Sequence, residues 1–77
     1  MRKYTKGVDI MPTLGNKLKT KRKAMNLTQE NIAEKLNINR VTYQGYEKDK
    51  HKPDIDTLAK LADILETSTD YLLGRYD

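Results

Sequence analysis

The stretch LTQENIAEKLNINRVTYQGYEKDKHKP, residues 27–53, decides the fold of this chain. Its first part predicts a short helix, because two aliphatic side chains stand four positions apart on one helical face, those of Ile32 and Leu36. Thr28 can cap the start of this helix, and Asn37 can end it because asparagine tolerates the left-handed conformation. We therefore expect a helix over about residues 28–36.

The second part of the stretch predicts another helix, over about residues 39–48, which is unusually polar. Asn39 can cap it, and its inward side chains by spacing are those of Tyr43 and Tyr46. This helix also carries four residues that a core does not need, which are Arg40, Thr42, Gln44 and Gly45. We interpret this side of the helix as a surface for a nucleic-acid groove.

Three further helices are predicted around this pair. Before it, Leu14 and Leu18 share one face of a helix that Thr13 can cap and Asn26 can end. After it, Asp54 can cap the helix with the strongest apolar period in the chain, formed by Ile55, Leu58, Leu61, Ala62 and Leu65.

The last predicted helix is short, begins after Ser68, points Leu72 inward and stops at Gly74. No part of the sequence has the alternating pattern of a strand. The chain is therefore expected to form a compact all-α domain of five helices over residues 13–74. Outside this domain we expect a flexible basic arm, residues 1–12, and a C-terminal tail, residues 75–77.

Composition limits the classes of protein to which the chain can belong. Its 77 residues are 36% apolar and 34% charged, enough for one small domain with a modest core. The absence of cysteine excludes disulfides and thiolate metal sites. The net charge of +4 suits a polyanionic partner, although charge alone is weak evidence. With no apolar run long enough for a membrane span and no secretory signal, we expect a cytoplasmic protein.

The two helices of the opening stretch must cross closely, because only a short turn joins them. Close approach of the backbones requires a small side chain, supplied by Ala33, and the turn requires a residue that tolerates positive φ, supplied by Asn37. The shared core is supplied by Ile32, Leu36, Ile38, Tyr43 and Tyr46. These positions together specify a helix-turn-helix unit.

The segment Leu14 to Gly74 resembles the phage-repressor-type helix-turn-helix family, also called lambda-repressor-like or xenobiotic-response-element type. The matching blocks are LTQENIAEKL, NINR, YEKDKHKP and LAKLADILETSTDYLLG, with matching spacing between them. Asn37 departs from the usual glycine of the turn but is chemically compatible. Tyr43 replaces an aliphatic residue, and its hydroxyl needs a partner or water, which favours a position partly at the surface. Gly45 inside a helix costs roughly 1 kcal/mol relative to alanine, which indicates either a close approach to DNA or a neutral surface site.

The resemblance implies that the helix over residues 39–48 lies in the major groove of double-stranded DNA. The residues carried over as base contacts are Arg40, Val41, Gln44 and Gly45. Arg40 can donate two hydrogen bonds to guanine or else hold a phosphate, and Gln44 can pair with adenine or else remain solvated. Val41 can pack on a thymine methyl group.

Other residues are expected to position the protein on the phosphates, while capping or solvation is the simpler role for each. They are Thr28, Gln29, Asn39, Thr42, Lys48, Lys50 and Lys52. The resemblance also implies a structural ion pair between Arg22 and Glu47. In the N-terminal arm, Arg2, Lys3 and Lys6 either reach DNA or have no role.

The resemblance further implies a homodimer on a pseudo-palindromic operator. The expected pairing surface is formed by Leu65, Tyr71, Leu73 and Tyr76, although Tyr71 and Leu73 can instead close the core of the same molecule. The primary prediction is a sequence-specific transcriptional regulator, a repressor of bacterial, phage or mobile-element origin. The alternative is an antitoxin-type module whose main partner is another protein.

Catalysis is not expected, because the sequence has no recognisable set of acid, base and nucleophile. The single histidine, His51, lies in a lysine-rich loop, where it is solvated or near a phosphate. No cofactor, metal site or small-molecule ligand is predicted.

Overall fold

The computed structural model describes residues 12–75, and all of its secondary structure is helical over that range. The five helices are α1 (Leu14–Ala24), α2 (Gln29–Leu36), α3 (Arg40–Glu47), α4 (Ile55–Ile64) and α5 (Thr69–Leu73). The prediction of an all-α domain with five helices is confirmed. The predicted arm and tail fall mostly on residues 1–11 and 76–77, outside the described part, so these two boundaries stay predictions.

Each helix begins at a polar side chain that accepts a hydrogen bond from the backbone N–H three residues later. These N-cap residues are Thr13, Thr28, Asn39, Asp54 and Ser68, as the sequence predicted. Such a cap satisfies a backbone donor that the helix itself leaves without a partner. Local sequence therefore fixes the starting point of every helix.

Asparagine residues with left-handed backbone lie at the end of α2 and just after the end of α1. Asn37 has φ 60° and caps α2, and its N–H donates to the carbonyl of Glu34. Helix α1 ends slightly earlier than predicted, at Ala24, and Asn26 is left-handed with φ 58°. Asparagine tolerates this region better than most residues, because its short polar side chain can hydrogen-bond locally.

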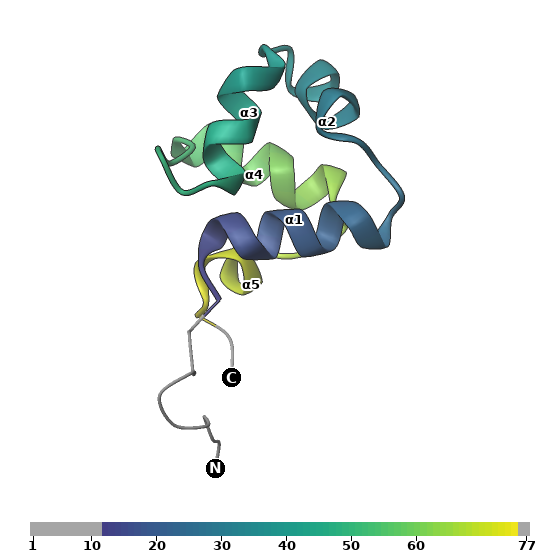
Figure 1. Cartoon of the computed structure of the whole chain (residues 1–77). Coiled ribbons are helices and arrows are strands. Elements are labelled where there is room, and N and C mark those ends of the chain that lie inside the picture. Colours follow the sequence, from purple (N-terminus) through teal and green to yellow (C-terminus); the bar gives the residue numbers. More distant parts are fainter. Residues whose placement is uncertain (1–11, 76–77) are drawn as a thin grey trace, which may run out of the picture.

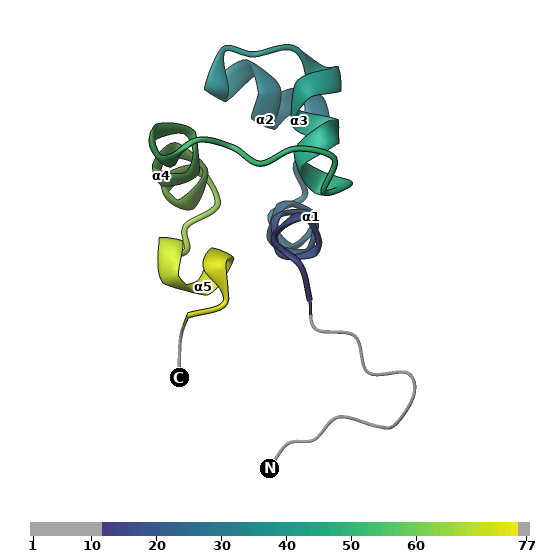
Figure 2. The ribbon, with the colours of Figure 1, turned by 90° about the vertical axis from the view of Figure 1, so that its left-hand side faces the viewer.

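The helices are arranged so that α2 and α3 pack against each other at one end of the domain and α5 lies at the other end (Figures 1 and 2). Helix α1 contacts both α3 and α5, and α4 contacts both α2 and α5. Helices α1 and α4 thus join the two ends and support the α2–α3 pair from below in these views. No helix within residues 12–75 is both long and apolar enough to cross a lipid bilayer.

The core lies between the five helices and includes several fully buried large side chains. These are Tyr43, Leu18, Ile32, Leu61, Leu65 and Leu72. Ala33 is also buried and belongs to the same cluster, which fits its predicted place in the close pairing of α2 with α3. The apolar period of α4 predicted most of its inward side, with Leu58, Leu61 and Ala62 buried.

Two expectations about the core were wrong. Ile55 was assigned to the buried stripe of α4, but it is 81% exposed as the first residue after the cap. Tyr43 was expected partly at the surface, but it is fully buried. Burial is possible because the Tyr43 hydroxyl donates to Oε2 of Glu47 inside the domain.

Candidate nucleic-acid interface

Helix α3 presents its first turn to the outside. Arg40 is exposed and Val41 is 64% exposed, although valine is a residue that usually prefers the interior. One turn later, Gln44 is half-buried on the side of the helix next to these residues. The opposite side of α3 is anchored in the core by Tyr43. The helix is therefore fixed in place while Arg40 and Val41 face outward and Gln44 lies half-buried beside them.

Gly45 does not belong to this exposed set, and the expectation that it faces outward was wrong. It is buried, because the imidazole of His51 lies directly against it. A Cβ at position 45 would overlap the ring and lie 2.6 Å from its Cε1 atom. The simpler alternative, a neutral surface position, is therefore wrong as well.

The loop after α3 carries an exposed group of positive charges, formed by Lys48, Lys50 and Lys52. Asp49 holds the start of this loop against α1, where its carboxylate accepts from Thr13 Oγ1 at 2.6 Å and from the N–H of Gly15 at 2.9 Å. Gly15 allows this approach, because a Cβ there would overlap the carbonyl oxygen of Glu47. Sequence reasoning missed both residues. A glycine in the first turn of a helix was the available signal of a close backbone contact.

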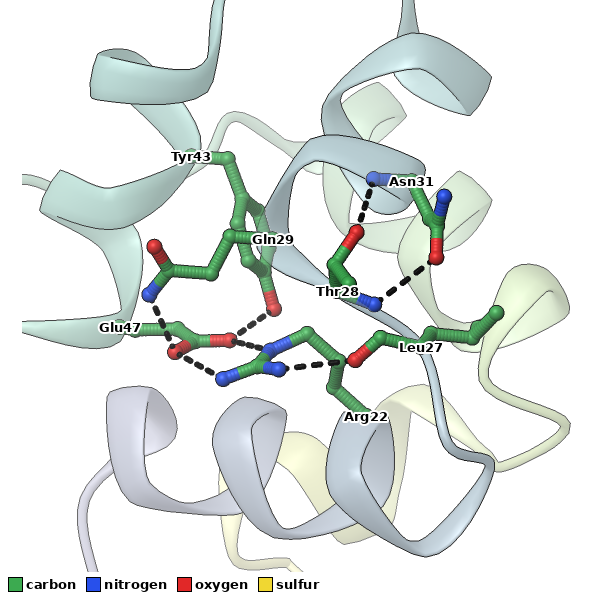
Figure 3. A network of polar contacts seen from close by, with 7 residues as sticks. All are labelled: Arg22, Leu27, Thr28, Gln29, Asn31, Tyr43 and Glu47. Atoms are coloured by element: carbon green, nitrogen blue, oxygen red, sulfur yellow. Dashed lines mark hydrogen bonds and ion pairs between the residues drawn. The ribbon is translucent and has the colours of Figure 1, made fainter.

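Beneath α3 lies a buried ion pair between Arg22 of α1 and Glu47 of α3 (Figure 3). Arg22 Nε is 2.6 Å from Glu47 Oε2, and Arg22 Nη2 is 3.1 Å from Oε1. The remaining Nη1 donates to the carbonyl of Leu27, 2.8 Å away. This two-pronged contact ties α1, α3 and the α1–α2 connection together.

Glu47 is the centre of a larger network, because Gln29 Nε2 donates to its Oε1 at 3.0 Å and the Tyr43 hydroxyl donates to its Oε2 (Figure 3). Burial raises the pKa of Glu47, but hydrogen bonds from Arg22, Tyr43 and Gln29 outweigh it and leave the pKa below its ordinary value. The hydrogen bond with Glu47 raises the pKa of Arg22, while burial raises that of Tyr43. The pair therefore stays ionised near neutral pH.

The residues expected at phosphates from α2 and the start of α3 have defined structural partners. Thr28 forms a reciprocal capping box with Asn31, in which each side chain accepts from the other residue's backbone N–H. Asn39 Oδ1 accepts from the N–H of Thr42 at 3.1 Å, and the Thr42 hydroxyl points to the same oxygen. The side chain of Gln29 turns toward Glu47. These contacts hold the two helix starts rigidly.

The expected pairing surface is only partly available. Leu65 is 2% exposed and belongs to the core, so its assignment to a pairing surface was wrong. Tyr71 packs against the core with Lys21 Nζ 4.9 Å from its ring centroid, whereas Leu73 is 50% exposed. Tyr76 lies outside the described residues, as do the basic residues of the arm, Arg2, Lys3 and Lys6.

Comparison with known proteins assigns this chain to a family. Residues 18–72 match the family described as Helix-turn-helix. The HTH-type transcriptional regulator ImmR of Bacillus subtilis is 48% identical over 63 residues, which cover 82% of this chain and 50% of that protein. The cryptic phage CTXphi transcriptional repressor RstR of Vibrio cholerae is 40% identical over 60 residues, covering 78% of this chain and 54% of that protein. The chain thus spans about half the length of these curated relatives.

A solved structure has the same fold. The P22 c2 repressor protein, solved in complex with a synthetic operator, aligns with a TM-score of 0.80 and 23% identity over 86% of this chain and 100% of that chain. The predicted family and fold class are therefore confirmed. The matched proteins carry names of transcriptional regulators and repressors, so the prediction that the chain is not an enzyme agrees with them.

Proposed function

Because this chain belongs to the helix-turn-helix family, we propose that it is a sequence-specific regulator that binds double-stranded DNA and represses transcription. The observation that carries this proposal is the outward side of α3. Arg40 and Val41 are exposed on a helix whose other side is locked into the core through Tyr43 and Glu47. A rigid helix with outward polar and apolar groups is what major-groove reading requires.

Three side chains of α3 read the base pairs in this proposal. The guanidinium of Arg40 donates two hydrogen bonds to O6 and N7 of a guanine, and Gln44 pairs with N6 and N7 of an adenine. The exposed Val41 packs on a thymine methyl group. Gly45 has no place in this set, because the ring of His51 covers it.

The groups around α3 hold the protein on the phosphates. Lys48, Lys50 and Lys52 supply positive charge beyond the C-terminal end of the helix. At the start of α2, the backbone amides after Thr28 and the side chain of Gln29 approach one phosphate, since helix N-termini favour anions. Asn39 and Thr42 flank the same groove at the start of α3.

Two molecules bind one pseudo-palindromic operator in the cytoplasm, with half-sites about one helical turn apart. The name of the relative RstR, a cryptic phage transcriptional repressor, supports both repression and a phage context, and the names of two further relatives also refer to a phage or prophage. Leu73 remains as an exposed apolar residue of the proposed pairing surface. Tyr76 stays part of it by prediction alone.

Selection of bound sites from random duplex DNA tests the proposal. We expect one short motif, repeated in inverted orientation at a fixed spacing, and affinity at least a thousandfold above random duplex at physiological salt. Binding that is equally strong on all duplexes would contradict sequence-specific regulation. Absence of DNA binding, together with tight binding to another protein, would instead support the antitoxin-type alternative.

A further inference from the structure

The loop from Lys48 to Lys52, called the lysine loop below, must lie in a fixed place if its charges are to meet phosphates next to α3. Two contacts secure its first half. The carboxylate of Asp49 accepts hydrogen bonds from the start of α1, and the N–H of Lys50 donates to the carbonyl of Gly45 at 2.9 Å. His51 stands in the second half, one residue before Lys52 and two before Pro53.

The His51 imidazole lies on the backbone of α3. Its Nε2, Cε1 and Cδ2 atoms occupy the space that a Cβ of residue 45 would need. Only glycine leaves this space open, which gives Gly45 a purpose that offsets its cost within a helix. The ring therefore fills a gap that the sequence of α3 itself creates.

The same ring also packs edge-on against Tyr46, with centroids 5.6 Å apart and an interplanar angle of 86°. Tyr46 packs edge-on against Tyr43 at 6.2 Å, and the hydroxyl of Tyr43 donates to Glu47. Edge-to-face pairs at these separations are favourable. A continuous series of contacts thus connects His51 with the buried ion pair beneath α3.

From these contacts we propose that His51 is a positioning residue for DNA binding, which holds the second half of the lysine loop against α3 so that Lys52 reaches a phosphate of the duplex that α3 reads. The inference rests on the proposed function, and it goes beyond that function by assigning a role to His51 and Gly45. It predicts that substitution of either residue changes DNA binding through Lys52 rather than through base recognition.

The test uses the full chain and a duplex carrying the site that the wild type selects. The slope of log K against log salt concentration reports the number of phosphates neutralised, at about 0.9 for each. We expect His51→Ala to reduce the steepness of this slope by about one unit, the contribution of one lysine. His51→Phe keeps an aromatic edge for Tyr46 and should recover the wild-type slope.

Gly45→Ala provides an independent variant, because its methyl group displaces the His51 ring while alanine favours the helix. We expect the same loss of slope, with a melting temperature no lower than that of the wild type. The double variant Gly45→Ala/His51→Ala should lose no more slope than either single variant, since both remove one contact.

An unchanged slope in His51→Ala, with selective binding by the wild type, would overturn this inference and leave the proposed function intact. A changed preference at one base pair with an unchanged slope would also overturn it, because His51 would then be reading a base. A wild type that selects no site would overturn the proposed function and the inference together.

Discussion

Glu47 is the residue on which the interior depends most. Its carboxylate accepts four hydrogen bonds, from two nitrogens of Arg22, from Gln29 and from the buried hydroxyl of Tyr43. A buried charged group requires a counter-charge and hydrogen-bond donors or acceptors, because an unpaired buried charge is strongly unfavourable. The family resemblance implied the ion pair between Glu47 and Arg22. The hydrogen bonds that Tyr43 and Gln29 donate to Glu47 are evident only from the structure.

Replacement of Glu47 by alanine should lower the free energy of unfolding by roughly 3–5 kcal/mol, because it leaves the Arg22 guanidinium buried without its counter-charge. Thermal unfolding followed by circular dichroism measures this loss. Among the molecules that stay folded at low temperature, the preferred DNA site should be unchanged. A melting temperature equal to that of the wild type would contradict the structural role.

The same carboxylate should make stability depend on pH in the acid range. The pKa of Glu47 is lower in the folded protein than its ordinary value, so its contribution is complete above the unfolded pKa of about 4.3. The contribution disappears as the pH falls through the lower, folded pKa. We expect the stability difference between the wild type and Glu47→Gln to be constant from pH 6 to 7 and to shrink below about pH 4. A constant difference down to pH 2 in denaturant titrations would show that Glu47 is not the titrating group.

Among the helices, the starts and ends were predictable because their causes are local. A cap such as Thr28 and a stop such as Asn37 act within three or four residues, so a short window of sequence contains the whole interaction. The inward side of α4 was also predictable from a short window, because its apolar residues recur at steps of three and four. Ile55 was assigned wrongly because periodicity does not show that the first turn extends beyond the core.

The turn between α2 and α3 offers a direct test at this scale. Asn37 has φ 60°, so Asn37→Ala should destabilise the domain by about 1 kcal/mol, because alanine has a Cβ and no polar side chain to compensate. Asn37→Gly is the matched control, since glycine adopts positive φ without a steric penalty. Equal melting temperatures for these two variants would show that left-handed strain at this position is unimportant.

The contacts that could not be predicted from the sequence join residues that are far apart along the chain. Asp49 binds residues 34 and 36 positions earlier, at the start of α1. The burial of Gly45 depends on the ring of His51, which comes from the loop that follows α3. No local pattern encodes such contacts, so Gly45 was assigned to an exposed surface that it does not occupy. The apolar period of α4 did place Leu65 inward, and only its second assignment, to a pairing surface, was wrong.

At the scale of the whole molecule, the residues proposed to read bases and the residues proposed to bind phosphates lie at opposite ends of α3. Exposed Arg40 and Val41 stand at the start of α3, whereas the lysines stand beyond its end. Substitution of Arg40 or Val41 should therefore change the DNA sequence preference. Substitution of a lysine after α3 should instead lower the affinity for every duplex.

The central claim is tested most directly by comparing Arg40→Ala with Lys50→Ala on the selected duplex and on single-base-pair variants of it, at several salt concentrations. Arg40→Ala should relax discrimination at one base pair of each half-site by about 1–3 kcal/mol and leave the other positions unchanged. Lys50→Ala should weaken all duplexes alike and reduce the salt slope by about one. Full discrimination at every base pair in Arg40→Ala, with its fold intact, would contradict the claim that the outward side of α3 reads DNA.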